Sequence, residues 1–211
     1  LHLSAYLQEI SLLQAGAPYA ELGISKRREE QRPTITVFND DLSFADSETK
    51  LSNANNGIAT IKISGVMREV GSASTLGAED IRDQLFSFYD NENIKAVVVD
   101  INSGGGESGA GFMLNAAISE RNKPVIARVT YAGSAAYMTA MACDEVHAAF
   151  AAAKIGGIGA FAQIDNEMIK TLKERVSFIY SDESDRKNEA FRGLLEGDQS
   201  KIKAEINAIG K

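Results

Sequence analysis

Between residues 57 and 150, extended apolar segments alternate with helical segments, and the links between them are short. The extended segments are rich in β-branched residues, and the helical segments carry apolar side chains on one stripe. Because parallel strands need a crossover connection, usually a helix, this order predicts an α/β fold around a mostly parallel sheet. The predicted strands are 58–67, 94–103, 123–130 and 145–150, and the predicted helices are 77–91, 109–122 and 134–144. The strand at 94–103 is continuously apolar, which is typical of burial on both faces.

Outside this stretch the pattern is less regular. Residues 3–15 place apolar side chains at helical spacing and predict an amphipathic helix that docks on the body or on a neighbouring subunit. Residues 23–56 are polar and predict an extension and loop. Towards the C-terminus we expect a helix at 166–175, a strand at 176–180 and a helix at 198–209. The predicted organisation is an N-terminal helix and polar extension at 1–56, followed by one folded domain at 57–211.

The charge and composition of the chain indicate which cellular compartment and which kinds of partner to expect. The chain has 211 residues and a net charge of −7, which argues against nucleic acid as the main partner. Its single cysteine, Cys143, has no intramolecular disulfide partner, so we expect a small buried side chain in a reducing compartment. No apolar run reaches the ~18 residues of a membrane span, and the N-terminus lacks a signal pattern. We therefore predict a cytoplasmic protein without a membrane partner.

A run of three glycines follows one of the buried strands, in "DINSGGGES" (100–108). Binding sites of open α/β sheets form at this edge, where the strands end. Glycine lets backbone N–H groups face a ligand without a Cβ in the way, although a tight turn explains the run equally well. A phosphate-binding loop is disfavoured, because neither a Gly-Lys-Ser/Thr sequence nor a G-x-G-x-x-G register is present.

Ser134 stands in a run of very small residues where the next predicted strand gives way to a helix. A helix N-cap explains a serine at this position, but it does not require the flanking Gly133 and Ala135. A nucleophile does require small neighbours, because an acyl substrate must approach it closely, and the helix N-terminus offers N–H groups to an oxyanion. A serine also needs a base. The two histidines are His2, at the terminus, and His147, which we expect to be half-buried in a strand.

A lysine can replace histidine as the base if burial keeps it neutral. The glycine run after "VVVDIN", the segment "YAGSAAYMTAMACDEVHA" and the segment "KIGGIGA" (154–160) together resemble the signal peptide peptidase A family of Ser–Lys peptidases. The resemblance covers roughly residues 57–195. It implies a Clp-protease/crotonase-like fold, built from repeated β-β-α and βαβ units around a mostly parallel sheet. Residues 57–211 then form the Ser–Lys peptidase domain.

The same resemblance implies the site residues. Ser134 matches the family's nucleophile, and the backbone amides of Gly105, Gly106 and Ala135 match its oxyanion hole. The family's lysine lies in a loop beyond the serine, after a helix and a strand. In this sequence that loop is "SDESDRKNEAF", which departs from the family's commoner version and contains one lysine, Lys187. Lys187 is therefore the predicted general base, with no metal or organic cofactor. We further expect a Gly106→Val variant to lose activity while keeping its fold.

The absence of an anchor makes the chain look more like the soluble prohead, or head-maturation, proteases of tailed phages and prophages. That likeness implies a homo-oligomeric serine endopeptidase that trims scaffold and capsid proteins in the host cytoplasm. Three alternatives stay open. The chain could be a signal-peptide-peptidase-like protease of other cytoplasmic peptides, or a non-catalytic assembly subunit. It could also be a crotonase-type enzyme acting on acyl-CoA thioesters, which needs a carboxylate and has Glu107 as the local candidate.

Overall fold

The computed structural model describes residues 31–37, 56–72, 75–184 and 186–210, and the predicted helix at 3–15 lies outside them. The chain divides into two units, Leu1–Ile158 and Gly159–Lys211. The division falls inside the single domain predicted at 57–211, whose boundary at residues 56 and 57 stays a prediction.

The described part of the first unit contains one six-stranded sheet, in the order β1-β2-β3-β4-β5, with β6 also paired to β4. All neighbouring strands are parallel except β1 and β2. The prediction of a mixed α/β fold around a mostly parallel sheet is therefore confirmed. The strands are β1 (Thr34–Val37), β2 (Gly57–Met67), β3 (Ile94–Gly106), β4 (Val125–Gly133), β5 (Glu145–Ala148) and β6 (Lys154–Gly156).

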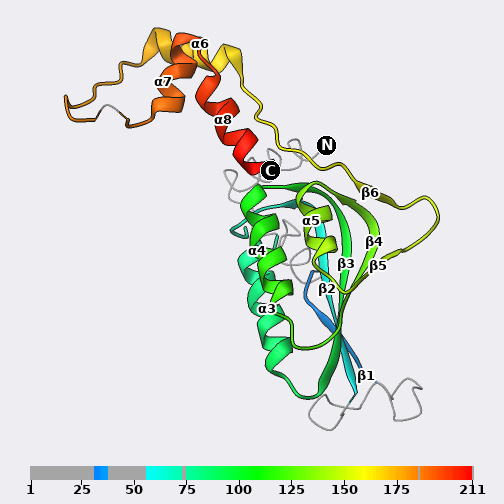
Figure 1. Cartoon of the computed structure of the whole chain (residues 1–211). Coiled ribbons are helices and arrows are strands. Elements are labelled where there is room, and N and C mark those ends of the chain that lie inside the picture. The colour runs from blue at the N-terminus through cyan, green and yellow to red at the C-terminus, as the bar shows by residue number, and fades with distance from the viewer. Residues whose placement is uncertain (1–30, 38–55, 73–74, 185, 211) are drawn as a thin grey trace, which may run out of the picture. The chain divides into compact units, whose positions relative to one another are not determined.

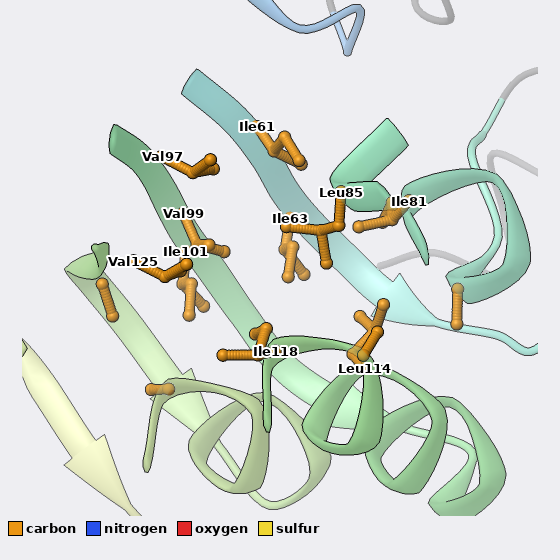
Figure 2. Packing of buried hydrophobic residues seen from close by; sticks show 14 of the residues in the cluster. Ile61, Ile63, Ile81, Leu85, Val97, Val99, Ile101, Leu114, Ile118 and Val125 are labelled. Carbon is orange, nitrogen blue, oxygen red and sulfur yellow. The ribbon is translucent and has the colours of Figure 1, made fainter. Parts of the chain in front are cut away.

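Three helices pack on one face of this sheet (Figure 1), and each follows a strand along the chain. They are α3 (Ala78–Asp90), α4 (Ser108–Ser119) and α5 (Ala135–Met141). The core between helices and sheet is made of branched aliphatic side chains (Figure 2), among them Ile61, Ile101 and Leu114, none of which exposes any surface. Burying each such side chain stabilises the fold by about 1.5–3 kcal/mol.

The prediction that the strand at 94–103 is buried on both faces is wrong. Within β3, Val97, Val99 and Ile101 face the helices and are buried, whereas Asp100 is half-buried and Asn102 is exposed. The alternation arises because the described helices of this unit, α3, α4 and α5, pack on the same face of the sheet (Figure 1). Polar side chains occupy the other face, where the Arg128 guanidinium donates to the Asp100 carboxylate at 3.0 Å.

The polar segment predicted as extension and loop also holds a strand. Residues Thr34–Val37 form β1, which pairs antiparallel with β2 in a register that places Thr34 opposite Thr60. The segment "TITV" is rich in β-branched residues, so the signal was present in the sequence but short. The edge of the sheet is therefore covered by a segment that precedes the predicted domain boundary.

The second unit contains α6 (Asn166–Arg175), α7 (Glu189–Glu196) and α8 (Ser200–Ile209). The helices predicted at 166–175 and 198–209 are confirmed, whereas α7 was not predicted and the strand predicted at 176–180 is absent. This segment contacts α7 through its aromatic side chains instead: the rings of Phe178 and Phe191 meet edge to face at 5.1 Å. In the described ranges, no helix has the length and apolar character needed to cross a membrane.

An ion pair joins the ends of α4, α5 and β4. The Arg121 side chain donates to Asp144 Oδ1 at 2.8 Å and to the carbonyl oxygens of Ile118 and Ala142 at 3.2 Å. The other carboxylate oxygen of Asp144 accepts the Val125 N–H at 2.8 Å. The hydrogen bond from Arg121, and then that from Val125, hold the pKa of Asp144 below its usual value.

This lowered pKa predicts an acid-sensitive contribution to stability. A carboxylate whose pKa is lower in the folded state stabilises the fold above its usual pKa, and this contribution is lost as the pH falls through the lowered value. Asp144→Asn should therefore lower the urea midpoint at neutral pH and flatten its decline in acid. Asp83→Asn, which removes an exposed partner of Arg82 on α3, should change neither. An unchanged acid profile in Asp144→Asn would contradict the assignment.

Candidate active site

Ser134 occupies the turn between β4 and α5 in a backbone conformation that is unusual for its residue type. Its φ is 50° and its ψ is −121°, whereas residues with a side chain strongly prefer negative φ. Such a conformation costs of order 1–3 kcal/mol and persists where the surroundings impose it. The Ser134 side chain makes no capping hydrogen bond to α5, so the N-cap explanation of this serine is wrong.

Hydrogen bonds on both sides of Ser134 impose this conformation. The Ser134 N–H donates to the Gly156 carbonyl of β6 at 3.2 Å, and the Met138 N–H of α5 donates to the Ser134 carbonyl at 3.0 Å. Gly133, directly before it, lies opposite Gly156 in the β4–β6 ladder. A serine on a strained strand-to-helix turn presents its hydroxyl at the edge of the sheet, which is the arrangement of a nucleophile elbow.

The glycine run of β3 lies directly against this turn. Gly105 has a φ of +96°, and a Cβ built on it would lie 2.6 Å from the Gly133 carbonyl oxygen and 2.9 Å from the Ser134 Cβ. The same Cβ would lie 2.9 Å from the Ala135 nitrogen, the first amide of α5. Both the backbone conformation and the lack of space therefore require glycine here. The two features that the sequence singled out are brought together.

Packing accounts for part of the small-residue run around Ser134. A Cβ on Gly111 of α4 would lie 3.0 Å from the Ala135 Cβ, so α4 and α5 approach closely at this point. Ala135 and Ala136 are both buried in the core. Their small size serves the contact between helices, and the case for a nucleophile rests instead on the conformation of Ser134 and its uncapped hydroxyl.

Ser103 is a part of the site that the sequence analysis missed. Its side chain is 1% exposed, and its Oγ donates to the Gly65 carbonyl at 2.6 Å. The same Oγ accepts the Gly105 N–H at 3.0 Å. The Gly105 amide, predicted as an oxyanion donor, is therefore already engaged, and Gly105 shapes the turn. A serine directly before a glycine run was the available signal.

The amide of Gly106 has a different orientation. The Glu107 N–H donates to the Met67 carbonyl at 3.0 Å, so Met67 makes the cross-strand bonds of the Met67–Gly106 pair. The Gly106 amide consequently points away from β2. A Cβ on Gly106 would meet the Met67 carbonyl oxygen and lie 2.7 Å from the Met67 nitrogen. The expectation that Gly106→Val keeps its fold is therefore wrong, because its side chain would collide with β2.

Gly105 provides a sharper test, with Gly104 as its control. Gly105→Ala should unfold more easily by about 1–3 kcal/mol and lose reactivity at Ser134, because both φ and the contact with Ala135 oppose a side chain. Gly104→Ala should keep the wild-type stability and the reactivity at Ser134, since its Cβ would lie 3.4 Å from the Tyr131 ring, an ordinary contact. Urea unfolding and the rate of labelling by a fluorophosphonate measure the two effects. Equal behaviour of the two variants would show that the glycine run is only a turn.

A second residue that the sequence analysis missed is Tyr131, which is 42% exposed beside the glycine run. Its ring and hydroxyl lie where side chains on Gly104 and Gly133 would point, the hydroxyl 3.5 Å from the first of these positions and 3.1 Å from the second. The register of β3 and β4 shifts just before Tyr131, which turns its side chain to the open face of the sheet. Tyr131 therefore lies against Gly104 and Gly133, the residues directly before Gly105 and Ser134.

Two further residues from the sequence analysis, His147 and Cys143, are not part of this turn. His147 is exposed on β5, its Nε2 lies 2.6 Å from Glu145 Oε2, and its partner in β4 is Arg128. Ser134 lies six residues beyond Arg128, about 20 Å along the strand, which separates His147 from it. The expected half-burial of His147 is wrong, because its strand lies near the sheet edge. Burial raises the pKa of Cys143 to about 12, which disfavours the thiolate, the reactive form of cysteine, at neutral pH.

Glu107 and Lys187 complete the predicted set. The Glu107 carboxylate accepts the Glu69 N–H at 2.7 Å and so ties the loop after β2 to the start of α4. Lys187 is exposed in the second unit, where its N–H donates to the Ser184 carbonyl at 3.1 Å just before α7. Because Ser134 belongs to the first unit and Lys187 to the second, their partnership stays a prediction.

Comparisons with known proteins find partial likenesses among solved structures. A mutant of ClpP1 from Listeria monocytogenes is 23% identical over 40% of this chain and 46% of its own, with a TM-score of 0.34. A membrane-bound stomatin-specific protease is 17% identical over 56% of this chain and 60% of its own, with a TM-score of 0.38. An enoyl-CoA hydratase from Mycobacterium avium subsp. paratuberculosis is 22% identical over 44% and 42%, with a TM-score of 0.33.

The chain thus spans less than two thirds of the length of each of these structures. They include two proteases and an enzyme of acyl-CoA chemistry. No protein-family model matches the sequence, and the comparison with curated proteins finds no match.

Proposed function

We propose that the chain is a serine endopeptidase with Ser134 as its nucleophile. The observation that carries this proposal is the conformation of Ser134, at a φ of 50° with no capping bond from its hydroxyl. A structural N-cap would use that hydroxyl and would not need the strained backbone. The abutting glycine turn at Gly105 and the first amide of α5 supply the small, polar surroundings that an acyl substrate requires.

In the proposed reaction the Ser134 oxygen attacks the scissile carbonyl carbon, and Lys187 accepts the hydroxyl proton. The amides of Gly106 and Ala135 stabilise the oxyanion, while Gly105, the third member of the predicted hole, shapes the turn. Collapse of the intermediate breaks the C–N bond, and the lysine passes its proton to the leaving amine. Water then hydrolyses the acyl-enzyme, and Lys187 again serves as the base.

The proposed setting is the maturation of a phage or prophage capsid, with scaffold or capsid proteins as substrates. It rests on the resemblance of the sequence motifs to head-maturation proteases. The proposal includes self-association, which rests on the same resemblance. Light scattering is expected to show an oligomer, and a monomer at all concentrations would contradict this part.

Labelling with a fluorophosphonate tests the function directly. The label should appear on the peptide that contains Ser134, be lost in Ser134→Ala, and weaken at low pH, where a lysine base is protonated. An acyl-CoA enzyme would instead bind acyl-CoA without labelling, with Glu107 as its carboxylate. The bond from the Glu69 amide to that carboxylate weighs against this alternative. A protein that neither reacts with the label nor binds acyl-CoA would be an assembly subunit.

A further inference from the structure

Two polar side chains are buried in the described parts of the chain, those of Ser103 and Thr139. The Thr139 hydroxyl donates to the Ala135 carbonyl at 3.0 Å, inside its own helix α5. The Ser103 hydroxyl instead joins two strands, since it donates to Gly65 in β2 and accepts from Gly105 in β3. A buried hydroxyl that links separate elements constrains how they sit against each other.

Both partners of Ser103 are glycines with positive φ. Gly65 has a φ of +75° at the irregularity in the β2–β3 register, and Gly105 has a φ of +96° against Ser134. A hydroxyl has one hydrogen to donate and lone pairs that accept, so Ser103 satisfies the Gly65 carbonyl and the Gly105 amide at the same time. Glycine is the residue with the greatest backbone freedom, and these two bonds restrict it at two positions.

We infer that Ser103 is a positioning residue for the glycine run at 104–106, which contains the proposed oxyanion donor Gly106. This inference rests on the proposed function. Its hydroxyl accepts a hydrogen bond from the Gly105 amide and so holds Gly105 against the backbone of Ser134 and Ala135. This anchoring fixes the orientation of the next peptide, so the Gly106 amide stays available for the acyl oxygen. Ser103 does not touch the substrate and acts through the two glycines.

Removal of the hydroxyl should impair the transition state more than substrate binding. Complete loss of one oxyanion donor lowers kcat by about 10²- to 10³-fold. Ser103→Ala leaves the donor present but poorly held, so we expect kcat to fall by about 10- to 100-fold with KM changed by less than about threefold. Ser103→Thr keeps the hydroxyl and should restore most of kcat.

Thr139→Val provides the matched control, since it removes another buried hydroxyl, one bonded inside α5, without touching the glycine run. The two variants should lose similar stability, but only Ser103→Ala should lose kcat. If kcat falls equally in both, or in neither while wild type is active, the positioning role is overturned. A wild type that neither cleaves peptides nor labels at Ser134 overturns the proposed function, and the positioning role falls with it.

Amide hydrogen exchange gives a readout that does not depend on activity. In the wild-type chain, NMR should show the Gly105 amide exchanging at least about tenfold more slowly than that of Gly106, because the first is bonded and the second is not. In Ser103→Ala this protection should be lost, whereas Thr139→Val should keep it. Fast exchange of Gly105 in the wild type overturns the inference even if Ser103→Ala fails to fold.

Discussion

Ser134→Gly is expected to make the protein more stable and completely inactive. Glycine adopts the observed φ of 50° without the steric strain that a serine Cβ meets. Relief of about 1–3 kcal/mol of strain exceeds the ~0.5–1 kcal/mol that glycine loses through its freer unfolded chain. The net gain should be about 1 kcal/mol, or about 2–4 °C in Tm for a chain of this size.

Ser134→Ala separates this effect from the loss of the hydroxyl. Alanine keeps the Cβ and its strain, so Tm should stay near that of wild type while the fluorophosphonate label disappears. If the serine were a structural N-cap, alanine would instead cost about 1 kcal/mol and glycine only a few tenths. Differential scanning calorimetry of the three proteins therefore distinguishes the two roles. The strain argument would be refuted if wild type had the highest Tm, Ser134→Gly the next and Ser134→Ala the lowest.

A residue that destabilises its own fold is informative about selection on the site. Glycine would relax the turn at position 134, and the neighbouring Gly133 shows that the chain uses glycine in this segment. Retaining a serine under strain has a physical purpose only if its hydroxyl is used, and here it makes no capping bond. This reasoning starts from an observed backbone angle, whereas the small-residue run proved to be explained partly by helix packing.

The sequence predicted the sheet well because its signals are local. Burial alternates along β2, where Ala59, Ile61 and Ile63 are buried, and the alternation of apolar and polar residues in this segment predicts it. Parallel order follows because α3 and α4 each lie between two consecutive strands of the sheet and serve as crossover connections. The two site features were found because both lie at the ends of parallel strands.

Other features depend on contacts that no local pattern records. Residues 176–180 have the composition of a strand, but the described residues offer them no strand to pair with, and Phe178 packs on Phe191 of α7 instead. The bond from the Gly105 amide to Ser103 arises within the glycine run, yet it becomes evident only once β2 brings Gly65 alongside. Contacts between residues far apart in the sequence therefore decide which backbone amides are already hydrogen-bonded.

Lys187→Ala is expected to be as inactive as Ser134→Ala to within about tenfold, because a nucleophile and its base act as a unit. Lys187→Arg should fail as well, since a guanidinium does not deprotonate in proteins. Lys173→Ala, which removes an exposed lysine of α6 in the same unit, should retain full activity. Peptide cleavage by each variant, with Ser134 labelling as a second readout, measures the effect.

The pH profile and the histidine variant complete this test. A lysine base works only when neutral, so wild-type activity should rise from neutral to alkaline pH and not level off near the histidine range. His147→Ala should remain active, because about 20 Å of strand separates His147 from Ser134. If His147→Ala is inactive while Lys187→Ala still cleaves, the Ser–Lys assignment is wrong.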